Sequence, residues 1–395
     1  MKFMKELSFT GKKVLVRADF NVPLDDDLKI TDDTRIRYVL PTINYLVGKK
    51  AKIILCSHLG RPKGKPDPAF SLKPVAGRLQ ALLGQPVVMA ADCLGPAVVS
   101  AIEEMGDGDV MLLENLRFHP GEAANDDDFA KALADLCDIY INDAFAVSHR
   151  ANASVEAIVK FAPACAAGLL LEKELTAFNT AMETPKRPLV AIVGGAKVSS
   201  KLKALYSIVD KVDALIIGGA MANTFLLARG YGLGRSKVEP ELIDDARKIL
   251  ARAGEKHVDV YLPVDAVTAA SIDQQTPGRI VKIDAVPAEA MILDIGPATV
   301  GLFSQAVAGA ATVVWNGPMG IFETPAFADG TRGLAAAVAD SKAFTVAGGG
   351  DTVAAINEAG VADKLSYIST GGGAFLALME GDPLPGVTAL ENSKK

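Results

Sequence analysis

Arginines and histidines recur in the polar loops that follow short apolar segments in the first part of the chain. The loops read Arg17-Ala-Asp19-Phe-Asn21, Ser57-His58-Leu59-Gly60-Arg61-Pro and Glu114-Asn-Leu-Arg117-Phe-His119, and Arg35 and His149-Arg150 lie in segments between them. An arginine presents a planar fork of donors that matches phosphate and carboxylate oxygens. Any one of these arginines could instead be a solvated charge on the surface. Together they favour a binding site for a small, multiply charged acid that bears phosphate.

The second half of the chain uses glycine and lysine instead. Val193-Gly194-Gly195-Ala196-Lys197-Val-Ser-Ser-Lys201 follows a predicted strand, and we expect it to open a helix with both lysines on one face. Glycine amides at a helix N-terminus bind anions. The pattern is not a Walker A loop, because G-x-x-x-x-G-K-[ST] does not occur in the chain. By itself, the Gly-Gly pair could instead serve only the packing of a helix on a sheet.

Three more glycine-rich segments follow predicted strands in the second half. They read Ile217-Gly218-Gly219, Trp315-Asn316-Gly317-Pro318-Met-Gly320-Ile-Phe-Glu323 and Ala347-Gly348-Gly349-Gly350-Asp351-Thr352. Asp351 is either the N-cap of a helix or, beside a polyphosphate, an anchor for Mg²⁺. A nucleotide region opposite an oxyanion region predicts phosphoryl transfer across a cleft.

The elements that must position these loops are short apolar strands that alternate with amphipathic helices. Expected strands cover residues 14–17, 52–57, 87–90, 110–114, 139–142, 189–193, 214–217, 258–262, 312–315 and 344–347; expected helices include 34–47, 72–83 and 129–137. Continuous apolar strands, each followed by a helix, indicate parallel sheets covered on both faces, where ligands bind beyond the carboxyl ends of the strands. The fold class predicted is α/β, with two doubly wound, Rossmann-like lobes.

The expected division of the chain has four parts. Residues 1–165 form an N-terminal lobe that binds the phosphate-bearing acid, 166–188 an interdomain helix and hinge, 189–365 a C-terminal nucleotide-binding lobe, and 366–395 a segment that packs back toward the first lobe. The return of that last segment rests on the family resemblance described below.

Composition excludes several classes of protein. The 395 residues are 50% hydrophobic and 22% charged, which is ordinary globular composition, and the formal charge of −6 argues against a nucleic-acid-binding polycation. No apolar run approaches the length of a membrane span, and the N-terminus MKFMKELSF lacks the apolar core of a secretory signal. Cys56, Cys93, Cys137 and Cys165 show no C-x-x-C spacing, so we expect core thiols in a cytoplasmic protein.

An absence among the motifs also bears on mechanism. No Ser-His-Asp unit, zinc cluster or H-R-D-like loop stands out in the sequence. A carboxylate acceptor, with a pKa of about 3.5–4, is already ionised at neutral pH and needs no general base. Catalysis then reduces to alignment and to neutralisation of charge on the moving phosphoryl group.

Taken together, these motifs resemble the phosphoglycerate kinase family. Arg17-Ala-Asp-Phe-Asn-Val-Pro, Ser-His-Leu-Gly-Arg-Pro-Lys-Gly-Lys, Glu-Asn-Leu-Arg-Phe-His, Gly-Gly-Ala-Lys-Val-Ser-Ser-Lys, Trp-Asn-Gly-Pro-Met-Gly and Gly-Gly-Gly-Asp-Thr occur in the family's order and spacing, from Gly11 to about Met379. The resemblance implies reversible transfer of the acyl phosphate of 1,3-bisphosphoglycerate to Mg·ADP, giving 3-phosphoglycerate and ATP, with lobe closure and Arg, Lys and Mg²⁺ neutralising charge.

The resemblance also implies roles for individual residues. Phosphoglycerate would be held by Asp19, Asn21, Arg35, His58, Leu59, Gly60, Arg61, Arg117 and Arg150. The nucleotide would be bound by Gly194, Lys197, Lys201, Gly218, Gly219, Asn316, Pro318, Glu323, Gly349, Gly350, Asp351 and Thr352, with Asp351 as the metal ligand. Catalytic roles would fall to Arg35, Lys197, Lys201, Gly371 and Gly372.

One loop departs from the family pattern. Ala146, Val147, Ser148 and Asn152 replace the glycine, threonine, alanine and second histidine of Ala-Phe-Gly-Thr-Ala-His-Arg-Ala-His, whereas His149 and Arg150 are kept. These replacements bear on the local geometry of the loop.

Two other classes of protein share some of these features. One is an inactive two-lobe nucleotide- or phosphate-binding paralogue, against which the paired lysines and the Gly-Gly-Gly-Asp-Thr segment argue. The other is a dinucleotide-dependent dehydrogenase, although no G-x-G-x-x-G follows the first strand with an acidic residue about 20 residues later. The expected partners are the small-molecule substrates alone, with no nucleic acid and no membrane, and the expected state is a monomer.

Overall fold

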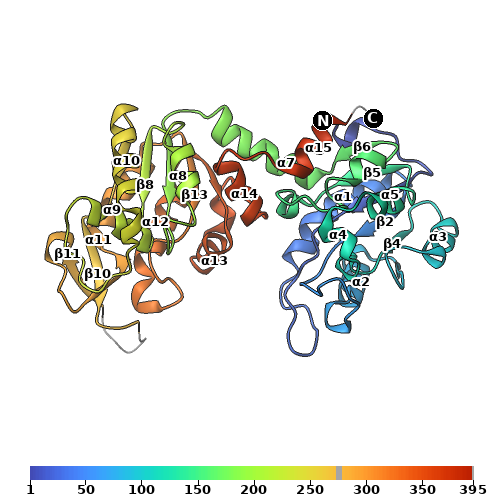
Figure 1. Ribbon diagram of the computed structural model, residues 1–395, viewed down its shortest axis with the longest axis horizontal. Coiled ribbons are helices and arrows are strands. Elements are labelled where there is room, and N and C mark those ends of the chain that lie inside the picture. The colour runs from blue at the N-terminus through green and yellow to red at the C-terminus, as the bar shows by residue number, and fades with distance from the viewer. Residues whose placement is uncertain (273–277, 394–395) are drawn as a thin grey trace. The chain divides into compact units, whose positions relative to one another are not determined.

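The computed structural model describes residues 1–272 and 278–393, which form two compact units along the chain (Figure 1). Unit 1 comprises Met1–Leu175 and Pro383–Lys395, and unit 2 comprises Thr176–Asp382. The helix α7 (Leu169–Phe178) begins in unit 1 and ends in unit 2. Among the described residues, no helix combines the length and the apolar character that crossing a membrane requires.

Unit 1 is built on a parallel sheet of six strands in the order β3-β4-β2-β1-β5-β6. The strands are β1 (Lys13–Arg17), β2 (Lys52–Cys56), β3 (Val87–Met89), β4 (Val110–Leu112), β5 (Ile139–Asn142) and β6 (Cys165–Ala167). The helices are α1 (Thr34–Gly48), α2 (Lys73–Leu83), α3 (Pro96–Glu103), α4 (Pro120–Ala124), α5 (Asp127–Ala134), α6 (Ile158–Phe161) and α15 (Pro385–Asn392), with short 3₁₀ turns η1 (Met4–Glu6), η2 (Pro68–Phe70), η3 (Leu116–Phe118) and η4 (Phe145–Val147). All four residues of β5 are buried, as in a sheet covered on both faces.

Unit 2 has a second parallel sheet of six strands, in the order β15-β14-β13-β7-β8-β9, and a three-stranded antiparallel sheet, β11-β10-β12. The strands are β7 (Leu189–Val193), β8 (Ala214–Ile217), β9 (Asp259–Tyr261), β10 (Asp265–Ala269), β11 (Arg279–Lys282), β12 (Met291–Ile295), β13 (Thr312–Asn316), β14 (Phe344–Ala347) and β15 (Tyr367–Ile368). The helices are α8 (Leu202–Ile208), α9 (Gly219–Ala228), α10 (Ile243–Glu255), α11 (Pro297–Ala308), α12 (Asp329–Asp340), α13 (Gly350–Glu358) and α14 (Gly372–Met379). Short turns are η6 (Pro240–Leu242), η7 (Ile283–Ala285), η8 (Pro325–Phe327) and η9 (Ala362–Lys364), and a π-helical stretch, η5 (Asn179–Glu183), continues α7.

The α/β class with two doubly wound parallel sheets is confirmed, and each expected strand overlaps an observed one. The sequence analysis missed β6, β15 and the three strands of the antiparallel sheet. The C-terminal segment also differs from its expected place, because β15 pairs with β14 and α14 packs against α8. Residues 366–382 therefore group with unit 2, and only the part from Pro383 onward groups with unit 1.

Candidate active site

A buried arginine lies at the carboxyl end of β1, one of the two central strands of the unit 1 sheet. Arg17 is 1% exposed; its Nε donates to Ser154 Oγ (2.8 Å), and its Nη2 lies 3.2 Å from His58 Nδ1. Glu122, equally buried, lies 3.8 Å from Arg17 Nη2 and accepts hydrogen bonds from the amide (2.9 Å) and hydroxyl (2.7 Å) of Ser154. A buried charge is tolerated only when it is paired in this way. Arg17 is thus a fixed part of the floor of the site.

Asp19 and Arg35 form an ion pair beside the buried residues Arg17 and His58. Arg35, on the first turn of α1, donates to Asp19 Oδ2 at 2.5 Å and keeps 40% of its side chain exposed. Asp19 Oδ1 accepts from the amide of Asn21 (3.1 Å), and Asn21 Oδ1 accepts from the amide of Gly60 (2.8 Å). Arg35 is therefore anchored at one nitrogen and open to solvent elsewhere.

The loop after β2 is held in a conformation that requires glycine. Gly60 has φ +58°, and a Cβ there would lie 2.2 Å from the Phe70 ring. Its carbonyl accepts from Arg117 Nη1 (2.8 Å), and the carbonyl of Leu59 accepts from Asn115 Nδ2 (2.7 Å). The loops after β2 and β4 are thus fixed to each other beside the floor residue Arg17.

Positive charge at this edge exceeds the charge of its carboxylates. Burial lowers the pKa of His58 well below its usual value, reinforced by Arg17, Arg117, Arg35 and Arg150, so the imidazole is neutral. Burial, and then the charge of Arg17, lowers the pKa of Arg117 to about 10. These shifts have the sign expected where cations gather without enough counter-charge.

Two further arginines of the expected set lie at the surface. Arg61 and Arg150 are exposed. Among the described residues, Arg61 has no ion-pair partner, and Arg150 Nε donates to His149 Nε2 (3.2 Å). Both are free to turn toward an anion.

The loop that departs from the family pattern keeps a regular backbone. Ala146 lies in the 3₁₀ turn η4, and it is not among the residues with positive φ, so alanine fits without strain. Ser148 Oγ donates to the carbonyl of Ala144 (3.1 Å). Asn152 Nδ2 donates to the carbonyl of Glu122 (3.2 Å). Ala146 is therefore accommodated without backbone strain, and Ser148 and the Asn152 amide nitrogen by local hydrogen bonds, whereas the buried Asn152 Oδ1 has no partner among the described residues.

In unit 2, the loops after β7, β8 and β13 approach one another at backbone distance. A Cβ on Gly194 would lie 2.2 Å from the carbonyl oxygen of Pro318, and a Cβ on Gly218 would lie 2.1 Å from Met319 Sδ. Gly219 has φ +65° and its amide donates to the carbonyl of Met319 (3.1 Å). Only glycine permits these contacts, so the loops have a packing role as well as any role toward a ligand.

The two lysines of the glycine-rich segment lie in different surroundings, which corrects the expected helical pair. Residues 194–201 form turns and α8 begins only at Leu202, so Lys197 and Lys201 do not share a helical face. Lys201 Nζ donates to the carbonyls of Gly194 (2.7 Å) and Asn316 (3.1 Å), whereas Lys197 is exposed. Burial lowers the pKa of Lys201 to about 8, with the Asp351 carboxylate opposing the shift.

The loop after β14 is tied to the loop after β13. Asn316 Nδ2 donates to the carbonyl of Gly348 (2.8 Å), and the buried hydroxyl of Thr352 accepts from the amide of Gly317 (2.6 Å). Gly349, at φ +101°, precedes α13, whose exposed first residue is Gly350. The segment therefore presents a helix N-terminus beside the lysine site.

Asp351 is not the N-cap of α13, because that position is Gly349. It lies in the first turn, is exposed, and its carboxylate makes no hydrogen bond or ion pair with another described residue. A free carboxylate next to phosphate-binding groups is the donor that Mg²⁺ takes in nucleotide sites. The residues present therefore fit a magnesium ion, whereas the capping interpretation is wrong.

The N-terminus of α14 lies beside that of α13. A Cβ on Gly372 would lie 3.5 Å from the Gly349 Cα and the Gly350 nitrogen. Gly371 is the N-cap of α14, and its amide donates to Ser369 Oγ (3.2 Å). Two helix N-termini, each with partial positive charge, thus converge on one side of unit 2.

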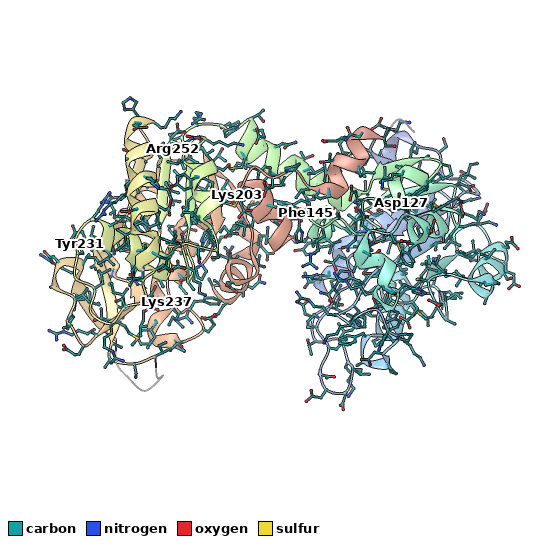
Figure 2. All side chains as sticks on the ribbon, viewed as in Figure 1. Asp127, Phe145, Lys203, Tyr231, Lys237 and Arg252 are labelled. Atoms are coloured by element: carbon teal, nitrogen blue, oxygen red, sulfur yellow. The ribbon has the colours of Figure 1, made fainter. Side chains whose placement is uncertain are left out.

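A pocket of about 360 Å³ opens next to these loops. Gly195, Gly219, Pro318, Glu323 and Asp351 line it together with Ala220, Asn223, Leu226, Lys237, Pro263, Ile272, Ile283, Ile292, Leu293, Asp294 and Ile321, among others. Lys237, on the segment between α9 and α10, is labelled in Figure 2. The apolar wall from β12 suits a flat aromatic base. The sequence analysis did not predict this wall, although the apolar run Met-Ile-Leu-Asp-Ile could have indicated it.

Burial raises the pKa of Asp294, on this wall, to about 7. Its carboxylate accepts from the amides of Gly330 (2.6 Å) and Ile295 (2.9 Å). Asp294 therefore fixes the wall to the start of α12.

Comparison with known proteins identifies this arrangement. Residues 4–382 match the family model described as phosphoglycerate kinase. The chain belongs to the phosphoglycerate kinase family. It is a phosphotransferase and has the glycolytic function of that family.

Individual relatives cover the whole chain. The phosphoglycerate kinase of Desulfosudis oleivorans is 65% identical over 394 residues, covering 100% of both chains, and that of Geobacter metallireducens is 56% identical over 396 residues, again covering both fully. The solved structure of phosphoglycerate kinase from Coxiella burnetii is 43% identical, with a TM-score of 0.92 over 99% of each chain. That from Pyrococcus horikoshii OT3 is 33% identical, with a TM-score of 0.86 over 100% of this chain and 99% of its own.

Proposed function

We propose that unit 1 binds 3-phosphoglycerate or 1,3-bisphosphoglycerate, that unit 2 binds ADP or ATP with Mg²⁺, and that the acyl phosphate passes reversibly between them. The observation that carries the proposal is the surplus of guanidinium groups around the neutral, buried His58. Such a surplus is unfavourable without a ligand, and a multiply charged phosphate ester relieves it.

The unit 1 residues divide into a fixed and an adaptable set. Arg17, held by Glu122 and Ser154, fixes the floor, although it was not assigned a substrate contact from the sequence. Arg117, Arg61 and Arg150 have donors free to turn toward carboxylate and phosphate oxygens. Asp19, Asn21, His58, Leu59 and Gly60 then orient the substrate or the arginines around it.

Three cationic groups are proposed to act on the transferring phosphoryl group. Arg35 uses one guanidinium nitrogen for its bond to Asp19, and its other nitrogens can donate to a ligand. Lys201 carries a compact charge where the unit 2 loops meet, and Lys197 is exposed near it. Charge neutralisation of this kind is the main catalytic term in phosphoryl transfer. The acceptor carboxylate is ionised already, so no residue is assigned as a general base.

The nucleotide is proposed to lie along the unit 2 pocket. The base packs on the apolar wall from β12, and its phosphates reach the convergent N-termini of α13 and α14, at Thr352, Gly371 and Gly372. Asp351 would hold Mg²⁺, which when bound neutralises phosphate charge. Gly194, Gly218, Gly219, Asn316, Pro318, Glu323, Gly349 and Gly350 would shape the pocket and its mouth.

Direct transfer also requires donor and acceptor oxygens to meet at one phosphorus atom. We therefore propose that the two units are brought together in the reactive complex, with α7 and its π-helical end as the connecting segment. A monomer acting in the cytoplasm, without nucleic acid or membrane, is the state we expect. The four cysteines are buried and none is paired with another in a disulfide, which supports the cytoplasmic assignment.

A coupled assay of ATP formation from 1,3-bisphosphoglycerate and ADP tests the reaction. Calorimetry with 3-phosphoglycerate alone, on the parent and on Arg117→Ala, tests the assignment of unit 1. The control is Arg78→Ala, which removes an arginine that pairs with Asp33 outside the site. We expect binding to weaken only in Arg117→Ala; turnover with equal affinity in all three proteins would refute the unit 1 site.

A further inference from the structure

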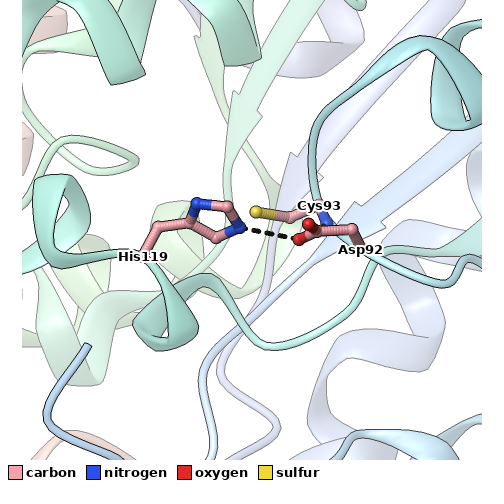
Figure 3. Close-up of side chains that lie close together, drawn as sticks. All are labelled: Asp92, Cys93 and His119. Atoms are coloured by element: carbon pink, nitrogen blue, oxygen red, sulfur yellow. Dashed lines mark hydrogen bonds and ion pairs between the residues drawn. The ribbon is translucent and has the colours of Figure 1, made fainter. Parts of the chain in front are cut away.

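Outside the arginine cluster, three metal-ligating side chains converge from two separate segments of unit 1. Asp92 and Cys93 lie between β3 and α3, and His119 lies between η3 and α4 (Figure 3). The carboxylate oxygen, the thiol sulfur and the imidazole nitrogen all lie within 4.8 Å of one another. Among the described residues, this is the single such group of three or more. The proposed reaction uses none of the three.

We infer that Asp92, Cys93 and His119 form a binding site for a zinc-class divalent cation. Zinc prefers nitrogen, sulfur and oxygen ligands, with metal–ligand distances of about 2.0–2.3 Å and tetrahedral geometry. Ligand atoms around such an ion are separated by about 3.2–3.7 Å. His119 Nε2 and Asp92 Oδ1 are now 2.7 Å apart, so they must separate by about 0.5–1 Å to bind one ion. Three protein ligands leave a fourth position for water, as in exchangeable zinc sites.

The surroundings hold each ligand in place without closing the site. The Cys93 amide donates to Asp92 Oδ1 (2.6 Å), and the His119 ring packs against Phe129 with centroids 5.5 Å apart. The side chains of Asp92 and His119 are 49% and 33% exposed, whereas Cys93 is buried. A cation can therefore enter past the carboxylate and imidazole and meet the sulfur at the bottom. Hard cations such as Mg²⁺, which prefer six oxygen ligands, do not suit this donor set.

Metal binding at this site exchanges a proton for an ion. A coordinated thiol is deprotonated. Each ion bound therefore forms one metal–sulfur bond at Cys93 and releases the thiol proton to solvent.

Cobalt(II) is the probe, because it enters zinc sites and gives a sulfur-to-metal charge-transfer band when a thiolate binds it. The protein is titrated without nucleotide or phosphoglycerate, and zinc is then added to displace the cobalt. We expect one equivalent of cobalt to produce the band, release of a proton, and loss of the band with one equivalent of zinc. Absence of the band, or failure of zinc to displace the cobalt, would overturn the proposal.

Variants assign the band to these residues. Cys93→Ser should abolish it, and Cys137→Ser, which alters another buried cysteine of unit 1, should leave it intact. Asp92→Asn keeps the acceptor for the Cys93 amide but loses the charge, and His119→Gln loses the imidazole. Loss of a residue that only supports a metal ligand lowers metal affinity about 10–100-fold. Loss of a ligand itself should cost at least as much, so we expect each of these two variants to bind cobalt at least about tenfold more weakly.

A thermal readout tests the site in case Cys93→Ser misfolds. An ion that binds only the folded protein raises its melting temperature by mass action. Micromolar zinc should therefore raise the melting temperature of the parent and of His257→Gln, a control in unit 2, more than that of Asp92→Asn or His119→Gln. Equal shifts in all four proteins would place the zinc elsewhere and overturn the proposal.

Discussion

At the carboxyl edge of the unit 1 sheet, the groups available to a ligand are charged side chains; at the same edge of the unit 2 sheet, they are mainly backbone amides beside an apolar pocket. Unit 1 supports its arginines with buried partners such as Glu122 and Asp19. Unit 2 instead brings loops together so closely that Gly194 and Gly218 admit no Cβ. The contrast suits the proposed ligands, because a small acid is recognised through charge and a nucleotide through shape.

The contrast also separates what each kind of substitution should do. Removing a guanidinium in unit 1 removes charge but leaves the fold, whereas adding one methyl group in unit 2 changes the shape of the pocket.

The largest effect is expected from Arg35→Ala. Its guanidinium faces solvent beyond Asp19 and is proposed to stabilise the transition state, so kcat should fall by about 10³-fold. Nucleotide affinity, measured by calorimetry, should stay nearly unchanged. Arg37→Ala is the matched control on the same helix, because Arg37 pairs with Asp33 at 2.7 Å. Unchanged kcat with only a raised KM for phosphoglycerate would remove the catalytic role.

The next effect is expected from Gly194→Ala in unit 2. The new Cβ would lie 2.2 Å from the Pro318 carbonyl oxygen and 2.7 Å from that of Gly317, so the backbone of that loop must move. Overpacking of this kind costs about 1–3 kcal/mol, or roughly 10–100-fold in nucleotide affinity if the bound shape requires the loop.

The control for Gly194→Ala is Gly254→Ala on α10, where nothing lies within 4 Å of the added atom. Calorimetry with ADP should separate the two variants, while affinity for 3-phosphoglycerate stays at the parent value in both. An unaltered ADP affinity in Gly194→Ala would mean that the close approach serves packing alone.

Much of this contrast could be predicted from the sequence, because strands buried on both faces read as continuous apolar runs. β1, β2, β7 and β13 were found this way. β6 was missed because Cys165-Ala-Ala carries no β-branched residue, and β11 because three of its four residues are exposed. Short or exposed strands lack the signal on which the method depends.

Sites made by tertiary folding were harder to predict. Lys197 and Lys201 have helical spacing, but the chain turns between them, so Lys197 is exposed and Lys201 is half-buried. Asp92 and His119 are 27 residues apart with no metal-binding spacing, and only the fold brings them together. Such contacts are set by packing, which composition and periodicity do not encode.

The C-terminal segment shows the same limit. The sequence analysis placed residues 366–395 with the first lobe, but β15 pairs with β14, so truncation after Leu365 removes an edge strand and α14 from unit 2. We expect such a truncation to lose nucleotide affinity as well as turnover, which calorimetry and the coupled assay would measure.

A pH effect should distinguish Lys201 from the arginines of unit 1. Its pKa, lowered to about 8 by burial, means that the free protein loses this charge as pH rises through 8. Nucleotide affinity should therefore weaken above pH 8, by at most about tenfold per pH unit. In Lys201→Arg the charge persists, so the affinity should be flat over this range. Equal pH profiles would show that Lys201 does not contact the phosphates through its charge.

The lowered pKa of Lys201 also makes the free energy of unfolding depend on pH. The pKa of Lys201 in the folded protein lies below its ordinary value of 10.5, so between about pH 8 and 10.5 the unfolded chain binds more protons. This group's contribution to the free energy of unfolding must then rise with pH across that window. Denaturation of the parent and of Lys201→Met at pH 7.5 and 10 measures it, because the variant lacks the titrating group. A difference between the two proteins that does not change with pH would contradict the shift.

The smallest effect is expected from Asp351→Asn. Nucleotide phosphates supply most oxygen ligands of a bound Mg²⁺, so losing one carboxylate should raise the magnesium concentration for half-maximal activity only a few-fold. The Asp351 carboxylate also raises the pKa of Lys201, so removing its charge favours the neutral form of the lysine. Magnesium titrations are therefore done at pH 7, where the Lys201 amine is charged in both proteins. Asp329→Asn is the control, because Asp329 is an acidic residue in the first turn of α12 and shares the helix-dipole effect without lining the pocket. If both variants need the same magnesium as the parent, Asp351 interacts with its helix and not with a metal, and unit 2 then recognises phosphate through its amides and lysines alone.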